Sequence, residues 1–195
     1  MHRWITHERV SRPVPSRLYR DGEPLDDYLF RRRRLGVDRA AVFASSLMVE
    51  ASLAREVGWD ETLRRHQDWD FLLRALDVPG AAMHQLPLTG IVSWFGSAGS
   101  MSAGADWASS LEWARRWKGR WSNAAYVDFL TAQTLRYAVQ ARSKKGLLEV
   151  ARELTDARRM PSASAMALGL SGVIPRGRLE AGAAALSAPV RVNSS

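Results

Sequence analysis

The residues best suited to chemistry lie in one short segment, residues 59–74. It contains Trp59, Asp60, Glu61, His66, Asp68, Trp69 and Asp70. A carboxylate held at a helix terminus can accept a proton from a hydroxyl group, and carboxylates together with a histidine can bind a divalent metal. The segment therefore predicts a general base or a metal site.

Two structural roles compete with these chemical ones. Alternation places His66, Asp68 and Asp70 on one side of an extended segment. If a helix begins at Trp69, however, Asp68 is its N-cap and Asp70 lies in its first turn. Carboxylates are favoured at both positions by free backbone N–H groups and by the helix dipole. Asp60, which precedes a polar turn, has the same capping interpretation.

The elements around this segment follow from hydrophobic periodicity and from turn residues. Helices are expected over residues 26–34, over 51–57 with a stop at Gly58, and over 68–76 with a stop at Pro79-Gly80. Buried strands are expected over residues 41–50 and 83–94. Residues 1–24, rich in Arg, Pro and Ser, are expected to form a loop or edge structure.

The second half of the chain has the pattern of a helical region. Helices are expected over residues 107–117, 123–142, 146–158 and 162–170. The predicted fold class is therefore α/β, with three parts. Residues 1–104 form a mixed half-domain, residues 105–188 a mainly helical extension, and residues 189–195 a disordered tail.

Composition excludes several functions. The chain has 195 residues, 46% of them apolar, which is enough for one domain with a core and an appendage. It has no cysteine, which excludes disulfides, cysteine-ligated zinc and thiol catalysis. No apolar run reaches the roughly 18 residues that span a bilayer, and no signal peptide is recognisable. A cytoplasmic protein, soluble or at a membrane periphery, is expected.

The charge is strongly basic, with a formal net charge of +8. Basic surfaces attract nucleic acids, anionic lipids and nucleotide phosphates, although many are only solvated faces. The sequence contains no RNP-like motif, zinc finger or clear helix-turn-helix, so no nucleic-acid partner is expected. Basic residues over 111–160 accompany Trp107, Trp113, Trp117 and Trp121. This pattern indicates contact with an anionic membrane surface, unless the tryptophans pack the extension onto the first half.

Four segments resemble, in the same order, the acceptor-side half of family 2 glycosyltransferases. They are FASSLMV at residues 43–49, VGWDETL at 57–63, QDWDFLLR at 67–74 and WFGSAGSMS at 94–102. The resemblance implies a partial fold of the GT-A type in residues 1–104. It also implies inverting transfer of a sugar from a nucleotide-sugar donor to a hydroxyl acceptor.

The same resemblance implies roles for particular residues. Asp68 matches the catalytic base, while His66, Gln67 and Trp69 would line the acceptor site. Trp94 and Ser100 would bind substrate from the last of the four segments. Two positions depart from the family pattern, because Gln67 replaces an acid before the base and Phe95 replaces an arginine in the loop.

The donor-side half of that family has no counterpart in the sequence. No Asp-x-Asp motif follows an apolar strand before residue 40, and Asp26-Asp27 is not assigned to metal. No cofactor is therefore expected within this chain, and Mg²⁺ or Mn²⁺ would belong to a complete enzyme. The sequence is interpreted as a truncated or split enzyme of cell-surface glycan synthesis. The alternatives are a hydrolase with a metal at His66, Asp68 and Asp70, and a basic, tryptophan-rich binding module without catalysis.

Overall fold

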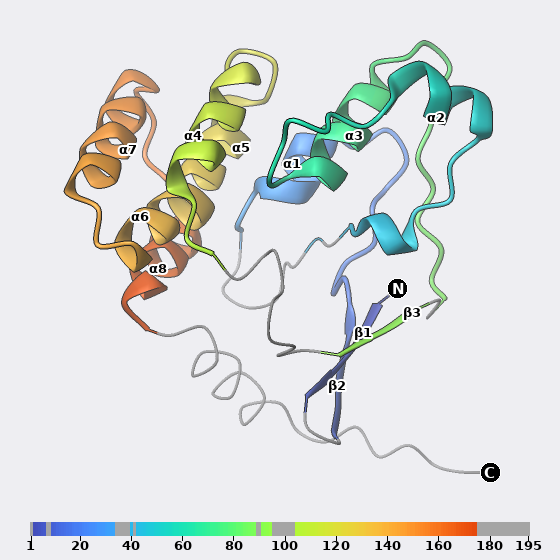
Figure 1. Ribbon diagram of the computed structural model, residues 1–195, viewed down its shortest axis with the longest axis horizontal. Helices are drawn as coiled ribbons and strands as arrows, with labels where there is room; N and C mark the ends of the chain where they lie inside the picture. The colour runs from blue at the N-terminus through green and yellow to red at the C-terminus, as the bar shows by residue number, and fades with distance from the viewer. Residues whose placement is uncertain are drawn as a thin grey trace.

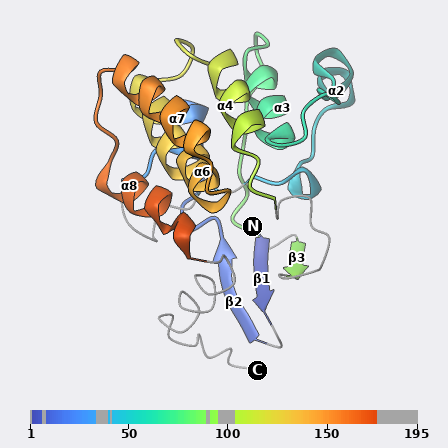
Figure 2. The same cartoon turned by 60° about the vertical axis from the view of Figure 1, so that its left-hand side comes forward.

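The computed structural model of the protein describes residues 2–6, 9–33, 40, 42–88, 91–94 and 104–174. Helices form the upper part of the molecule in Figures 1 and 2, and a small sheet lies beneath them. The described residues include no helix that is both long and apolar enough to cross a bilayer.

The sheet has three strands, β1 (His2–Thr6), β2 (Arg9–Val14) and β3 (Ile91–Trp94), in the order β2-β1-β3. β1 and β2 are antiparallel, with His2 opposite Val14, whereas β1 and β3 are parallel, with His2 opposite Ile91. The prediction of a loop or edge structure over residues 1–24 agrees with β2, which lies at an edge of the sheet, and is wrong for β1, which is the central strand.

Three helices come from the first half of the chain. They are α1 (Leu25–Phe30), α2 (Ala51–Val57) and α3 (Gln67–Leu76). Each was predicted with approximately these bounds. Gly58 ends α2 with a φ of 60°, a backbone conformation that costs glycine less than any other residue.

The predicted α/β half-domain of the GT-A type is wrong, because helices dominate the described structure. Residues 42–50 contain the 3₁₀-helix η1 (Ala44–Ser46) in place of the first predicted strand. Both the backbone N–H and the hydroxyl of Ser46 donate to the carbonyl oxygen of Phe43. This local closure uses groups that a strand would give to a neighbour. The second predicted strand is reduced to β3, the last four of its twelve residues.

The second half is helical, as predicted. Its helices are α4 (Trp107–Arg116), α5 (Asn123–Phe129), the π-helix η3 (Leu130–Leu135), α6 (Arg136–Gln140), α7 (Lys144–Asp156), α8 (Ala163–Leu170) and the 3₁₀-helix η4 (Ser171–Val173). α8 packs closely on η3, because a Cβ atom at Gly169 would overlap the carbonyl oxygen of Thr131. The predicted tail, residues 189–195, lies outside the described residues.

One aromatic cluster joins the two halves. Phe30 of α1 lies 5.3 Å from Trp69 of α3 and 6.1 Å from Trp113 of α4, measured between ring centroids. Trp121 and Phe129 complete the cluster, at 4.5 Å and 5.1 Å from Phe30. The predicted half-domain and the predicted extension therefore share one core.

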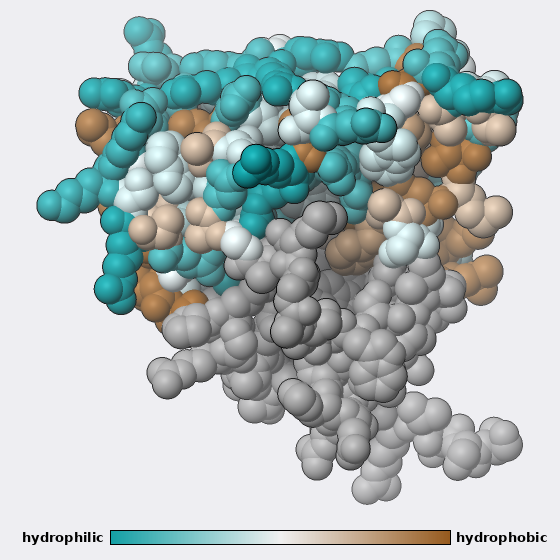
Figure 3. All heavy atoms as spheres, viewed as in Figure 1, coloured by the Kyte–Doolittle hydropathy of each residue, from teal (hydrophilic) through white to brown (hydrophobic). Residues whose placement is uncertain are grey.

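The tryptophans of the extension belong mainly to this core and not to the surface. Trp113, Trp117 and Trp121 are at most 6% exposed. On the face shown in Figure 3, hydrophilic residues cover the upper and left margins, and hydrophobic residues gather at the right margin. The predicted contact with an anionic membrane thus loses its aromatic component and stays a prediction for the basic residues alone.

Candidate active site at the first turn of α3

α3 begins at an unusual backbone conformation. His66 is the N-cap residue and has a φ of 64°, in the left-handed region that non-glycine residues seldom adopt. The side-chain ring of His66 makes contacts that stabilise this strained backbone conformation. The ring Nε2 lies 2.9 Å from the Ser110 hydroxyl, which is 3.3 Å from the Thr134 hydroxyl. The ring also stacks on Trp69, with centroids 5.0 Å apart and planes 10° from parallel.

His66 is held in its neutral form. Burial and the positive charge of the neighbouring Arg65 lower the pKa of His66 to about 3. A neutral imidazole can hydrogen-bond to a hydroxyl, but it carries no charge near neutral pH. His66 therefore anchors the loop that precedes α3 to helix α4, through Ser110.

Asp68 lies in the first turn of α3 and is not its N-cap, because the helix begins at Gln67, two residues earlier than the sequence predicted. The residue is half-buried. Burial raises the pKa of its carboxyl group, and hydrogen bonds from the backbone of Ala44 and of Asp68 itself oppose that rise only in part. Within the described residues, no Lys, Arg or His forms an ion pair with Asp68. Its carboxylate is thus a stronger proton acceptor than an ordinary aspartate.

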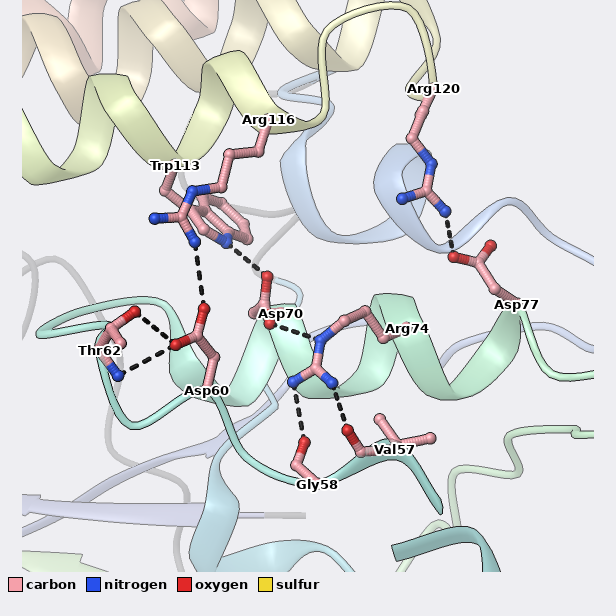
Figure 4. Close-up of polar contacts among 10 residues, drawn as sticks. All are labelled: Val57, Gly58, Asp60, Thr62, Asp70, Arg74, Asp77, Trp113, Arg116 and Arg120. Carbon is pink, nitrogen blue, oxygen red and sulfur yellow. Dashed lines mark hydrogen bonds and ion pairs between the residues drawn. The ribbon is translucent and has the colours of Figure 1, made fainter. Parts of the chain in front are cut away.

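Asp70, by contrast, is committed to holding the fold together. It is 5% exposed, and its two oxygens accept from Arg74 Nε at 2.7 Å and from Trp113 Nε1 at 2.9 Å. Arg74 also donates to the carbonyl oxygens of Val57 and Gly58, as Figure 4 shows. Asp70 and Arg74 therefore tie α3 to both the end of α2 and the middle of α4.

Asp60 is equally engaged. One of its oxygens accepts from the backbone N–H and the hydroxyl of Thr62, and the other accepts from Arg116 at 3.1 Å (Figure 4). The hydrogen bonds from Thr62 contribute most to lowering the pKa of Asp60. The predicted structural role for Asp60 agrees with this geometry, although the turn that it closes does not begin a helix.

The other predicted site residues are dispersed. Gln67 is half-buried and donates to the carbonyl oxygen of Leu63, and Trp69 packs between the aromatic core and the His66 ring. Trp94 is the last residue of β3, where its backbone pairs with Ile5. Ser100 lies outside the described residues. The roles of these residues in binding an acceptor stay predictions.

The alternative metal site does not form at the three predicted ligands. His66 faces Ser110, and Asp70 is bonded to Arg74 and Trp113, so neither converges with Asp68. Across the described ranges, no three His, Cys, Asp or Glu side chains are grouped to hold a metal ion. The expected need of a complete enzyme for Mg²⁺ or Mn²⁺ stays a prediction.

Some residues that build this site were not selected from the sequence. Arg74 follows Asp70 by four residues, a spacing that favours an ion pair on a helix and could have identified the pair. Trp113 and Ser110 lie more than 40 residues from their partners, and no local pattern predicts either contact.

Comparison of the chain with protein-family models, with curated proteins and with solved structures gives no significant match. The resemblance to family 2 glycosyltransferases therefore depends on the four short segments in the sequence alone.

Proposed function

We propose that Asp68 is a general base that accepts a proton from a hydroxyl group during glycosyl transfer. The observation that carries this proposal is the contrast among the aspartates of the segment. Asp60 and Asp70 are occupied by structural partners, whereas Asp68 has a raised pKa and no cationic partner among the described residues. A carboxylate in that state gains free energy by accepting a proton.

The position of Asp68 suits this role. The first turn of a helix holds a side chain rigidly, and the network from His66 through Ser110 fixes the start of α3. An acceptor hydroxyl that reaches Asp68 would lose its proton as its oxygen attacks the anomeric carbon of the donor sugar. The leaving nucleotide departs from the opposite side, which inverts the anomeric centre.

Glycosyl transfer is favoured over other proton-abstracting reactions by the four segments that resemble family 2 enzymes. This part of the proposal comes from the sequence and extends only to the acceptor side. We assign only the base to this chain, because its sequence contains no counterpart of the donor-side half.

The test is a transfer assay on the longest in-frame product of the gene. It uses a panel of UDP- and GDP-sugars, Mg²⁺ or Mn²⁺, and hydroxyl acceptors, with nucleotide release and glycoside product as readouts. Asp68→Asn should lower turnover by about 10²- to 10⁴-fold, the usual contribution of a general base. Asp60→Asn is the matched control and should retain most of the activity.

Two results would contradict the proposal. One is an Asp68→Asn protein that keeps a substantial part of wild-type turnover. The other is an NMR titration of the wild-type chain in which the Asp68 carboxyl titrates below 3.8, as the Asp60 carboxyl is expected to do.

A further inference from the structure

A cavity of about 450 Å³ lies at the opposite end of α3 from Asp68. Asp77 at the cavity follows Asp68 by nine positions, a distance of roughly 13 Å along a helix. The volume falls within the range of roughly 300–1,000 Å³ that is typical of small-molecule sites. The larger apolar side chains of the lining include Leu25, Leu73, Leu76, Met83, Trp117 and Trp121.

Four carboxylates line the same cavity, and three of them have an ionisable partner. The pairs are Asp21 with His84 at 3.2 Å, Glu23 with Arg17 at 2.7 Å, and Asp77 with Arg120. Figure 4 shows the last of these pairs. The Arg120 guanidinium also lies 4.4 Å from the centroid of the Trp117 ring, so the chain itself already occupies that aromatic face.

Asp26 is the fourth carboxylate, and no cation of the described part of the chain pairs with it. The residue is 8% exposed, and its Oδ2 accepts from the backbone N–H of Ser122 at 2.7 Å. Among the described residues, no donor bonds to its Oδ1 and no cation forms an ion pair with it. A buried carboxylate is costly unless a cation or further donors compensate for it, so this oxygen is suited to a ligand that brings a positive charge.

The neighbouring Asp27 provides an internal comparison. It accepts from the hydroxyl of the same Ser122 and lies 4.0 Å from the guanidinium of Arg33, but it does not line the cavity. The two adjacent aspartates of α1 thus share a partner at the start of α5 and differ in access to the cavity.

We propose that this cavity binds a small organic cation, with its ammonium group against Asp26 and its apolar body against Leu73 and Trp121. Charge selects the cation, because the lining is acidic in a chain whose net charge is +8. The apolar lining selects a ligand with a hydrocarbon or aromatic body over a bare metal ion. This site is independent of Asp68 and of the reaction proposed for it.

The test compares three probes that share one aromatic body and differ in charge. They are 2-phenylethylammonium, its neutral isostere 2-phenylethanol, and the anion phenylacetate. Binding to the wild-type chain is followed by NMR at the indole N–H resonances of Trp117 and Trp121, which line the cavity. The ammonium should bind about tenfold or more tightly than the alcohol, the difference expected for a hydrogen bond to a charged group. Phenylacetate should bind most weakly.

Two variants assign the preference to one side chain. Asp26→Asn keeps an oxygen for the Ser122 N–H and should remove the preference for the ammonium over the alcohol. Asp27→Asn is the matched control and should leave that preference unchanged.

Equal affinity of the three probes would overturn the proposal. So would the absence of any chemical-shift change of the indole N–H resonances at about 10 mM probe, because the proposal requires at least millimolar affinity. An Asp26→Asn protein that folds and still prefers the ammonium would overturn it as well. If Asp26→Asn does not fold, the three-probe comparison on the wild-type protein decides the matter.

Discussion

Asp68 should destabilise the protein at neutral pH, because its folded-state pKa is raised above the unfolded value. Folding disfavours the charged form of Asp68. The stability that its protonated form contributes is therefore complete below the unfolded pKa and is lost as pH rises through the folded pKa. Asp68→Asn should therefore raise the free energy of unfolding at pH 7, and the gain should vanish toward pH 3.

Denaturant unfolding at a series of pH values measures this effect. Asp60→Asn is the control, and its effect on stability should have the opposite sign. The pKa of Asp60 is lowered in the folded protein, and its carboxylate pairs with Arg116. If Asp68→Asn instead lowers the free energy of unfolding at neutral pH, the Asp68 carboxylate stabilises the folded protein, and the prediction is wrong.

His66 should make the protein sensitive to acid. Its pKa is about 3 in the folded protein, whereas an unfolded histidine titrates near 6.5. The stability of the neutral ring is complete above pH 6.5 and is lost as pH falls, because only the unfolded chain takes up the proton. At about 1.36 kcal/mol for each pKa unit, the loss approaches about 5 kcal/mol near pH 3.

His66→Gln should flatten the dependence of unfolding free energy on pH between about 6.5 and 3. An imidazole NMR signal of His66 that titrates near pH 6.5 in the folded protein would contradict the prediction.

One hydrogen bond between α3 and α4 comes from the indole N–H of Trp113. Trp113→Phe removes the donor to buried Asp70 and should cost about 1–3 kcal/mol beyond the loss of ring volume. Trp117→Phe is the matched control, because its indole nitrogen is buried with no hydrogen-bond partner among the described residues.

Unfolding free energies of the two proteins provide the measurement, and the difference between them isolates the hydrogen bond. If Trp117→Phe is as destabilising as Trp113→Phe, the cost comes from packing, and Asp70 does not depend on this donor.

The sequence predicted the elements whose signals are local. The stop at Gly58, the periodicity of residues 68–76 and the helical second half all depend on residues within a few turns of one another. The pairing of β1 with β3 was missed because the two strands lie about 90 residues apart and no local pattern carries it. The pairing of β1 with β2 is local, but the Arg and Pro residues of this region are typical of a loop or edge structure. Residues 41–50 were apolar enough for a strand, but Ser46 closes the backbone there by donating twice to the carbonyl oxygen of Phe43.

The difference between local signals and long-range contacts also applies to the candidate site. Asp68 was selected as a base in the sequence through the resemblance to family 2 glycosyltransferases, and that role stays a prediction. Its raised pKa, the left-handed backbone at His66 and the engagement of Asp70 by Trp113 depend on tertiary packing. These features distinguish the aspartate that is available to accept a proton from those that hold the fold together. They are visible only in the folded chain.

At the scale of the whole molecule, the shared aromatic core predicts that residues 15–88 and 104–174 unfold together. Phe30 and Trp69 contact Trp113, so separating the two halves would expose large aromatic surfaces. Unfolding followed by helix circular dichroism and by tryptophan fluorescence should give coincident transitions.

A chain that ends at residue 104 should, for the same reason, lack the near-ultraviolet dichroism of ordered aromatic residues. Two separate transitions in the whole chain, or a folded fragment of residues 1–104, would establish instead that the two halves are independent domains.

The closely packed indoles also have an optical consequence. The ring centroids of Trp113, Trp117 and Trp121 lie between 5.2 Å and 6.5 Å from one another. At such separations the electronic transitions of the rings couple, and excitation passes from one indole to the next before emission. The tryptophan emission of this protein is therefore a collective property of the cluster, and changing one of these rings will alter the spectrum of the others.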